Sequence, residues 1–350
     1  LDYFTLGFGT MVGVGWLVLM DDWLQRGGPA GVVLGFAIGG LALLPIALVY
    51  GRLVTAIPDA GSEIAYTARV FPSGASFATG WMMMLAYLIV CPWEAVAVGR
   101  LAAYLFPGLD ALELYRVAGK PVFLPRLALG LALTAAITLI NYRGIRPSAS
   151  FQKWMTFVLL AMFAAFAGSA VGRGSLDNLR PPFSHGGLLS VLLVLQIVPY
   201  FMTGFESVPK CAEEAAPEFR ERGFVRAMLL ALGVGVVFYT AVVALVAYLR
   251  PWQTLASRQF ATAVAFEQAF RSTRVVDLLF LAALVSLTKV FNGNFIAASR
   301  LLFALGRRRL VDPRLGRVHE TNRTPVVAIM AVGVFTAGAA LLGESILVPI

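Results

Sequence analysis

The segment TLGFGTMVGVGW, residues 5 to 16, places Gly7, Gly9, Gly13 and Gly15 inside an apolar run. A glycine in a helix interior costs about 1 kcal/mol relative to alanine, so a buried soluble helix rarely contains four of them this close together. In a soluble βαβ protein, the first three would be a loose variant of the glycine-rich turn that binds dinucleotides. In a membrane protein, they would mark an interrupted helix. The composition of the whole chain decides between these two interpretations.

The composition is that of a membrane protein. Of the 350 residues, 59% are hydrophobic and only 13% are charged, and the mean hydropathy is +0.80. Soluble domains are about 45–50% apolar and about 25% charged. These values exclude an ordinary soluble domain, and with it the dinucleotide-binding turn.

The apolar residues are grouped in runs that are long enough to cross a bilayer. A transmembrane helix needs about 20 mostly apolar residues, and nine such runs follow one another along the chain. We therefore expect an all-α polytopic membrane protein with nine spans, and residues 344–350 could begin a tenth. The predicted spans are 3–24, 29–50, 76–106, 124–142, 151–172, 187–208, 223–249, 275–305 and 324–343.

Basic residues are unevenly distributed between the two alternating sets of loops. Arg100 and Lys289 fall inside spans, and the rest of the 28 Lys and Arg residues divide into sixteen in one set and ten in the other. Cytoplasmic loops carry the excess of Lys and Arg, so we expect a cytoplasmic N-terminus in a multi-pass protein of the cell membrane. The same distribution accounts for the net charge of +9 without a nucleic-acid partner.

The residues of metal sites and of covalent catalysis are sparse. Cys91 lies in a span and Cys211 in a predicted cytoplasmic loop, so no disulfide framework is expected. His185 and His319 both fall in polar loops, whereas an intramembrane metal or haem site would need histidine within a span. We expect no cofactor and no metal. Because no pair of nucleophile and base is visible, an intramembrane enzyme is disfavoured.

Two of the predicted spans contain residues that interrupt a helix. The first is interrupted near residues 13–15, and the sixth contains IVPYFMTGFESVP, residues 197–209, with Pro199, Gly204 and Pro209. Interrupted helices survive in a bilayer where the freed backbone lines a cavity or packs against protein. Two of them in corresponding halves of the chain are typical of an inverted-repeat transporter, with its site at the breaks. A channel would instead show pore-lining repeats. The remaining alternative is a glycine face for helix packing.

Six segments of the chain resemble the amino acid–polyamine–organocation family of transporters. GTMVGVG (9–15) and FMTGFES (201–207) are similar to its signature segments at the two breaks. The other matches occur in the family's order and cover almost the whole chain. They are AIPDAGSEIAYTARVFPSGASFATGW (56–81), NYRGIRPSASFQ (141–152), NFIAASRLLFALGRRRLVDP (294–313) and NRTPVVAIM (322–330).

The resemblance implies a five-plus-five inverted-repeat fold with broken helices 1 and 6. The first repeat would be residues 1–172 and the second residues 187–350, truncated in span 10. The substrate would sit at mid-membrane between the two breaks, flanked by spans 3 and 8. The chain opens at Leu1 within two or three residues of its first span, so we expect the true N-terminus to be missing. Family members usually have twelve spans, so we expect this chain to be a fragment that lacks the rest of span 10 and the last two spans.

The backbone at the two breaks would bind an amino acid substrate. By resemblance to the family motif, the N–H groups of Gly13, Val14 and Gly15 would hold the carboxylate, because the N-terminal end of a half-helix carries positive charge. Val14 stands where many relatives have serine, so one hydroxyl donor is lost. The substrate ammonium would be accepted by backbone carbonyls of Thr10, Met11, Met202 and Thr203.

Three further residues of the sixth span are expected to shape the cavity. Gly204 would let the backbone approach the substrate closely, since it has no side chain. Phe205 and Tyr200 would form a wall or a gate of the cavity.

Two acidic residues lie deep in predicted spans, where ionisable groups are candidates for function. Glu94, in CPWEAVAVG, matches a glutamate that many relatives carry beside the substrate, and it would carry a proton or contact an amine. Its alternative role is a hydrogen-bond partner of unwound backbone. Glu206, in GFES, follows the second break and would accept backbone N–H groups, link to span 1 or relay protons.

Lys289, in VSLTKVFNGN, is the third deep ionisable residue. Sodium-coupled relatives have a cation site between spans 1 and 8, and proton-coupled relatives often replace that cation with a lysine on span 5. The corresponding part of span 5 here, residues 156–166, contains no lysine. We therefore expect Lys289 to supply the charge from span 8, with its side chain turned toward the break of span 1 and partnered by carbonyls, Glu94 or Glu206. The alternative is a side chain that reaches to a membrane interface.

Together these observations predict a secondary active transporter of amino acids, coupled to protons or working by exchange, with sodium less favoured. A polyamine or ethanolamine-type amine permease is the alternative, which the additional acid Glu94 would suit. The expected partners are the amino acid or amine, a proton and the lipid bilayer.

Overall fold

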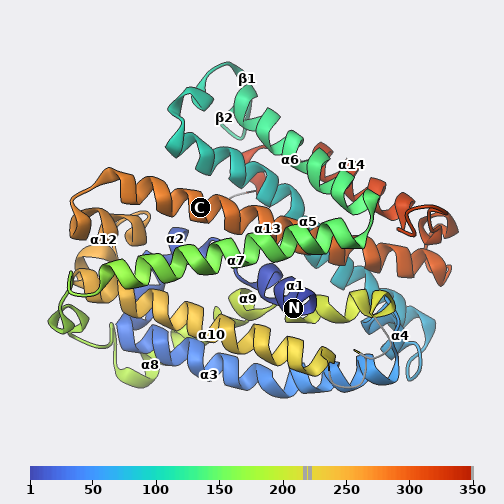
Figure 1. The fold of residues 1–350 in the computed structure, drawn as a ribbon, viewed down its shortest axis with the longest axis horizontal. Helices are drawn as coiled ribbons and strands as arrows, with labels where there is room; N and C mark the ends of the chain where they lie inside the picture. The colour runs from blue at the N-terminus through green and yellow to red at the C-terminus, as the bar shows by residue number, and fades with distance from the viewer. Residues whose placement is uncertain (216–218, 220–222, 348–350) are drawn as a thin grey trace.

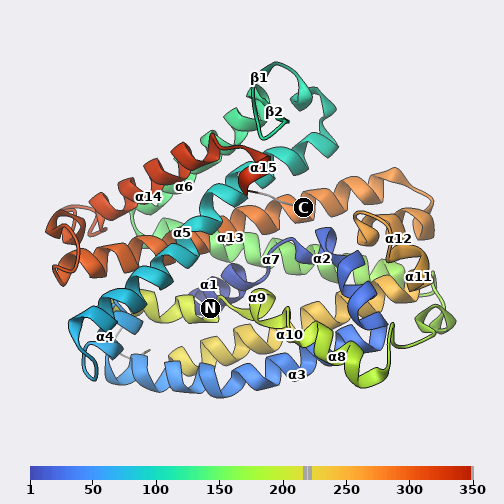
Figure 2. The same ribbon diagram turned by 180° about the vertical axis from the view of Figure 1, so that it is seen from behind.

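The computed structural model describes residues 1–215, 219 and 223–347. Its helices form layers: α3, α8 and α10 make one side, α5, α6 and α14 the opposite side, and α1, α7 and α13 lie between them (Figures 1 and 2). The bounds are α1 (Asp2–Met11), α3 (Met20–Ala56), α5 (Ser73–Leu105), α6 (Leu124–Arg143), α7 (Ile145–Ala170), α8 (Gly187–Leu195), α10 (Gly223–Leu249), α13 (Thr273–Arg307) and α14 (Val326–Ala340).

Proline and glycine set the ends of several helices. Pro72 precedes α5, Pro125 lies in the first turn of α6, and Pro325 precedes α14. Proline suits these positions because the first N–H groups of a helix have no partner within it. Gly144, with φ of 138°, makes the sharp turn between α6 and α7.

The first predicted span is broken, as the sequence predicted. Helix α1 ends at Met11, and α2 (Gly15–Val18) begins after an interruption at residues 12–14. The helix then continues as the first turns of α3, which also contains the second predicted span. The two spans meet at Gly28, whose φ of 60° and ψ of 173° are not helical.

The sixth predicted span is broken as well. It consists of α8, α9 (Val198–Met202) and the 3-10 helix η3 (Phe205–Glu214), with Thr203 and Gly204 between the last two. The parts on either side of residues 196–197 are bent by 48° relative to each other. The predicted interruptions near residues 13–15 and within residues 197–209 are both confirmed.

The predicted spans all have helical counterparts, but they are not nine long helices. Among the described residues, six helices are long and apolar enough to cross a membrane, or seven when the bent pair is one span. The first predicted span falls short because its break divides it, and α14 has only 15 residues. Of the predicted tenth span, Glu344–Leu347 form α15, and residues 348–350 lie outside the described part.

The connections contain short elements that we did not predict. The chain between α5 and α6 forms an exposed antiparallel hairpin of β1 (Glu113–Val117) and β2 (Lys120–Phe123). Shorter helices fill other loops, namely η1 (Pro107–Asp110), η2 (Leu176–Leu179), η5 (Pro313–Gly316), α4 (Glu63–Thr67), α11 (Trp252–Leu255) and α12 (Ala261–Phe270).

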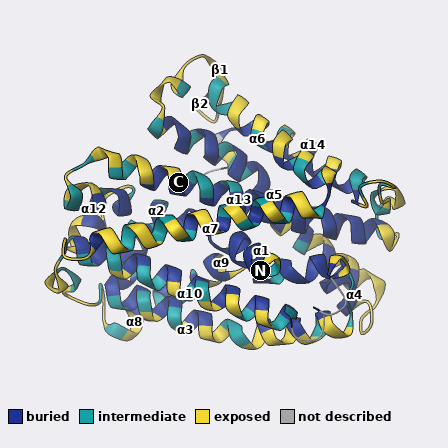
Figure 3. Ribbon diagram, viewed as in Figure 1, coloured by how far each residue is buried: buried dark blue, intermediate teal, exposed yellow. Residues whose placement is uncertain are grey.

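The most deeply buried elements are α1 and the second half of α13. Every residue of α1 from Phe4 to Met11 is buried, and so is nearly every residue of α13 from Ser286 to Gly306. Figure 3 shows these segments dark, whereas α3, α6 and α7 expose apolar outer faces. The break of the first span, which directly follows α1, therefore lies in the interior of the molecule.

Candidate functional site

The two breaks lie against each other. A Cβ atom placed on Gly204 would be 2.6 Å from the backbone nitrogen of Met11, and Gly204 has a φ of 126°. The hydroxyl of Ser207 donates to that of Thr10 at 3.3 Å. Only glycine combines this positive φ with so close an approach of two backbones. Residues almost 200 positions apart therefore form one site.

Aromatic side chains pack behind the breaks. Phe201 lies against Gly15, where an added Cβ would be 2.6 Å from the phenyl ring. Its ring contacts Trp23 edge to face at 4.8 Å between centroids, and Trp23 in turn contacts Phe36 and Tyr239. These rings pack against the part of the first span that follows its break and the part of the sixth span that precedes its break. They exclude water from that side of the site.

Met11 and Met202 present only their backbone to the site. The Met11 sulfur lies 2.5 Å from a Cβ placed on Gly235 of α10, and the Met202 methyl group lies 3.7 Å from that Cβ and 3.5 Å from one placed on Gly40. Both side chains are buried. The Met11 carbonyl also accepts a hydrogen bond from the Tyr239 hydroxyl at 3.4 Å, so it is partly satisfied without a ligand.

Lys289 turns toward the break of the first span, as we predicted. Its ammonium donates to the carbonyl of Gly9 at 3.0 Å and to that of Val12, and it lies 5.5 Å from the ring centroid of Phe8. The side chain is fully buried, which rules out the alternative of reaching to an interface. Carbonyls at a helix C-terminus carry negative partial charge, so they stabilise an ammonium there.

Ser286 is a neighbour of this ammonium that we did not predict. Its hydroxyl donates at 2.9 Å to the carbonyls of both Val12 and Gly13. The signal for it was present, because residues three apart share one face of a helix and Ser286 precedes Lys289 by three. Helix α13 thus binds the carbonyls of the unwound segment with the Ser286 hydroxyl and the Lys289 ammonium.

Glu94 lies in α5, the helix that packs against α13. It is 2% exposed, and its Oε2 atom makes no hydrogen bond within the described chain. Among the described residues no ion pair joins Glu94 to Lys289, whose ammonium donates to backbone carbonyls instead. Of the partners that we named for Lys289, the structure therefore shows the carbonyls and not the carboxylates.

Glu206 is engaged in hydrogen bonds at the second break. One carboxylate oxygen accepts from the backbone N–H of Gly204 at 2.7 Å, and the other accepts from the Tyr87 hydroxyl at 2.9 Å. Of the three roles that we considered, acceptance of backbone N–H groups is observed. Glu206 thereby ties the break to α5.

The two predicted wall residues differ in exposure. Tyr200 is 75% exposed and Thr203 is also exposed, whereas Phe205 is buried at 2%. The halves α1 and η3 are almost completely buried. Exposed residues therefore border the breaks on the side of α9, whereas the side of η3 is buried.

Lys210 and Cys211 occupy a different place from the one predicted. We placed both in a cytoplasmic loop that begins near residue 209, but η3 extends to Glu214 and buries both side chains. The reason is that η3 packs between α1, α10 and α13. Lys210 forms an ion pair with Glu63 at 2.7 Å. Residues 216–218 and 220–222 of the predicted loop lie outside the described residues.

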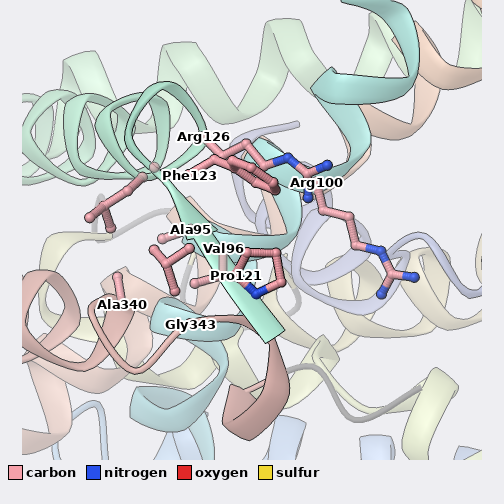
Figure 4. Close-up of a pocket in the computed structure, with 11 residues that line it drawn as sticks. Ala95, Val96, Arg100, Pro121, Phe123, Arg126, Ala340 and Gly343 are labelled. Carbon is pink, nitrogen blue, oxygen red and sulfur yellow. The ribbon is translucent and has the colours of Figure 1, made fainter. Parts of the chain in front are cut away.

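One hollow lies beside the site and another lies apart from it. One borders the break of the first span and is lined by Val14, Val18, Trp93, Ala97, Arg100, Leu101 and Phe260. The other lies between α5, β2 and α6, away from the breaks, with Arg126 beside the Phe123 ring (Figure 4). Within the described chain, no cluster of three or more His, Cys, Asp and Glu side chains could hold a metal ion.

Comparison with protein families gives one match over nearly the whole chain. The model of the family described as "Amino acid permease" matches residues 3–348. The match includes both breaks and every residue of the site described above.

Curated relatives align with almost the whole of this chain. The "Methylthioribose transporter" and the "Branched-chain amino acid permease BcaP" of Bacillus subtilis (strain 168) are each 26% identical; the alignments cover 97% and 100% of this chain and 73% and 74% of the relative. The "Aromatic amino acid transport protein AroP" of Escherichia coli O6:H1 is 24% identical over 96% of this chain and 72% of its own length.

Proposed function

This chain belongs to the amino acid permease family, whose members are multi-pass membrane transporters and not enzymes. From that premise we propose that it is a secondary active transporter of amino acids. The observation that carries the proposal is the contact between the two breaks, where Gly204 lies against the backbone of Met11. This contact brings unwound backbone of both spans to one place in the interior.

The backbone at the breaks has the polarity that an amino acid requires. A zwitterion is costly to bury unless both of its charges find partners. We assign the carboxylate to the N–H groups of Gly13, Val14 and Gly15, and the ammonium to carbonyls of Thr10, Met11, Met202 and Thr203. Tyr200 would contact the substrate from the exposed side, and Phe205 would form the buried floor below Gly204.

Lys289 supports transport without sodium. Its ammonium already neutralises the carbonyls of Gly9 and Val12, and a sodium ion there would be repelled by it. We therefore propose proton-coupled symport or exchange, with Glu94 as the group that carries the proton and Glu206 as a structural link that could relay it. A buried carboxyl group is neutral when it is protonated. The protein can therefore change its access state without the free-energy cost of keeping a charge buried.

The orientation is proposed from the basic residues of the loops. The burial of Lys210 and Arg300 removes two residues from the richer set and leaves fourteen against ten. The bias still favours a cytoplasmic N-terminus in the cell membrane. The side of η3 would then be the cytoplasmic side, and the exposed side of α9 the external one.

A carrier of polyamines or other organic amines is the second candidate. The Oε2 atom of Glu94, buried and without a hydrogen bond among the described residues, favours it, because a second ammonium of the substrate could pair with that oxygen. The branched-chain and aromatic permeases among the relatives favour the first candidate.

Uptake by the full-length protein in proteoliposomes tests the proposal. We expect saturable uptake of a radiolabelled amino acid that is accelerated by unlabelled substrate inside the vesicles, both with and without sodium. Parallel assays with putrescine and ethanolamine decide between the two candidates. Flux that neither saturates nor shows counterflow would refute a carrier, and a requirement for sodium would refute the role of Lys289.

A further inference from the structure

Below the second break, a buried ion pair joins η3 to the short helix α4. We propose that Lys210 and Glu63 form a latch that holds η3 in its closed position and thereby positions the break at Gly204. The inference rests on the proposed transport function, because a latch matters only if η3 moves during a cycle. Neither residue contacts the unwound backbone itself, so both are positioning residues.

Lys210 has its ionic and hydrogen-bonding partners inside the protein. The side chain is fully buried, and its ammonium donates at 2.7 Å to the Glu63 carboxylate and at 2.7 Å to the Glu206 carbonyl. It also lies 5.2 Å from the ring centroid of Tyr87 and 6.0 Å from that of Tyr50. Water is excluded from the ammonium, so its charge is balanced only by these groups.

Glu63 depends on the same contact. Its Oε1 atom accepts from Lys210 and, at 2.8 Å, from the Tyr50 hydroxyl of α3. Its Oε2 atom is buried and makes no hydrogen bond among the described residues. A buried carboxylate with one satisfied oxygen is stable only while its cation is present. Loss of either partner leaves an uncompensated charge in the interior.

The pair is connected to the break through Glu206. Lys210 holds the Glu206 carbonyl, and the Glu206 carboxylate accepts the N–H of Gly204 and the hydroxyl of Tyr87. Helices α3, α4, α5 and η3 therefore meet in one network of hydrogen bonds that ends at Gly204. Displacing η3 from α4 must separate the ion pair and shift the backbone of the break at the same time.

A rim of exposed ion pairs surrounds the latch. Glu213 binds the backbone N–H of Ala60 at 2.9 Å and pairs with Arg307, which also pairs with Asp59. Exposed pairs contribute only about 0–1 kcal/mol each, whereas breaking a buried pair costs several times more. The buried pair is therefore the part of this contact whose loss should change the position of η3.

Cys211 provides a reporter of that position. It follows Lys210 directly and is 2% exposed, and Cys91 is the second cysteine of the chain. In the full-length protein with Cys91 and any cysteine outside this chain replaced by serine, Cys211 should react slowly with a polar maleimide while η3 is closed. We measure the rate in detergent without substrate and divide it by the rate in denaturant, which corrects for the altered charge beside the thiol.

We expect Glu63→Gln and Lys210→Met each to accelerate this reaction about tenfold or more. Because the residues act as a pair, the double variant should react about as fast as each single variant, whereas independent effects would multiply to about a hundredfold. Lys210→Arg keeps the charge and should stay near the unmodified rate. Glu113→Gln and Arg116→Met, which break an exposed pair in the hairpin, serve as matched controls and should change nothing.

Transport kinetics give an independent readout. A protein whose η3 opens more readily spends less time accessible on the α9 side, so Glu63→Gln should raise the external KM severalfold at an unchanged amount of folded protein. A merely structural defect would lower the yield and the melting temperature and leave KM unchanged.

Three results would overturn the latch: unchanged Cys211 reactivity in both single variants, multiplicative effects in the double variant, or equal acceleration in the hairpin controls. The alkylation assay needs no substrate. Failure of amino acid uptake in the unmodified protein would therefore refute the proposed function, while slow, latch-dependent alkylation would still reveal a moving η3.

Discussion

At the scale of single residues, the site balances buried charge mostly with backbone. Lys289 is held by the carbonyls of Gly9 and Val12, and Glu206 by the N–H of Gly204. Such partners carry partial charges that do not titrate, so protonation of a side chain changes the net charge of the site. Glu94 differs, since its Oε2 atom has no hydrogen bond within the described chain. These two cases lead to separate predictions.

We predict that Lys289→Ala lowers substrate exchange about tenfold to a hundredfold, because each lost hydrogen bond to a charged group costs about 1.5–3 kcal/mol. The pH dependence that Lys289 contributes should be lost, whereas proton coupling through Glu94 should remain. Exchange of labelled substrate in proteoliposomes at several pH values measures both effects. Thr288→Ala, whose hydroxyl only bonds its own helix, is the control on the same helix. Unchanged exchange in Lys289→Ala would contradict the assignment.

We predict that Glu94→Gln abolishes accumulation driven by a pH gradient while exchange of substrate remains measurable. Glutamine fills the same space but cannot carry a proton, so binding survives and coupling does not. Accumulation and exchange are measured in the same vesicles, with the exchange assay as the control for folding. Accumulation equal to that of the unmodified protein would make Glu94 a structural residue.

At the scale of elements, the position of a helix break depends on glycine at a contact. Gly204 combines a φ of 126° with the backbone of Met11 within 3 Å of an added Cβ. Gly9 is similarly confined, since its Cβ would meet the amide of Gln152 at 2.1 Å. Glycines of α3 instead accommodate valines of α8, α9 and α10, which is the packing role that we considered as the alternative for the interrupted spans. Glycine therefore allows the two backbones to approach at the breaks, and elsewhere it allows close packing of helices.

We predict that Gly204→Ala reduces transport at least tenfold, because the strained backbone alone costs about 1–3 kcal/mol and the methyl group would separate the two breaks. Thermal unfolding and uptake of the purified variant measure the effect. Gly233→Ala is the matched control, since a Cβ at Gly233 meets nothing within 4 Å and should be neutral or slightly stabilising. Equal activity of the two variants would show that the contact is dispensable.

At the scale of the whole molecule, exposed residues border the breaks on one side of the described chain, and the other side is packed. Tyr200 and Thr203 are exposed, while α1 and η3 are packed against α7, α10 and α13. A carrier by alternating access must reverse this asymmetry during each cycle. The ion pairs that hold η3 lie on the packed side, where separation is needed for release.

We predict that a cysteine at Thr203 reacts with a membrane-impermeant thiol reagent much faster than a cysteine at Ser207, by about tenfold or more, in a background without Cys91 and Cys211. Ser207 is fully buried, and burial of this kind protects a group except during opening. Substrate should slow the reaction at position 203. Equal rates at both positions, or labelling of Thr203→Cys only from the side of η3, would contradict this asymmetry.

The sequence by itself determined the membrane class, the spans and the two interruptions, because these depend on local composition and on residues that break helices. It also indicated Lys289 and Glu94, since charge within an apolar run is rare whatever the fold. Only the tertiary structure decided which carbonyls Lys289 binds, that Ser286 joins it, and that Lys210 pairs with Glu63 across 147 positions. Lys210 looked like a loop residue because hydropathy records the cost of burying a charge and not the partner that offsets it. Such partners come from distant elements, and their contact exists only after the helices have packed.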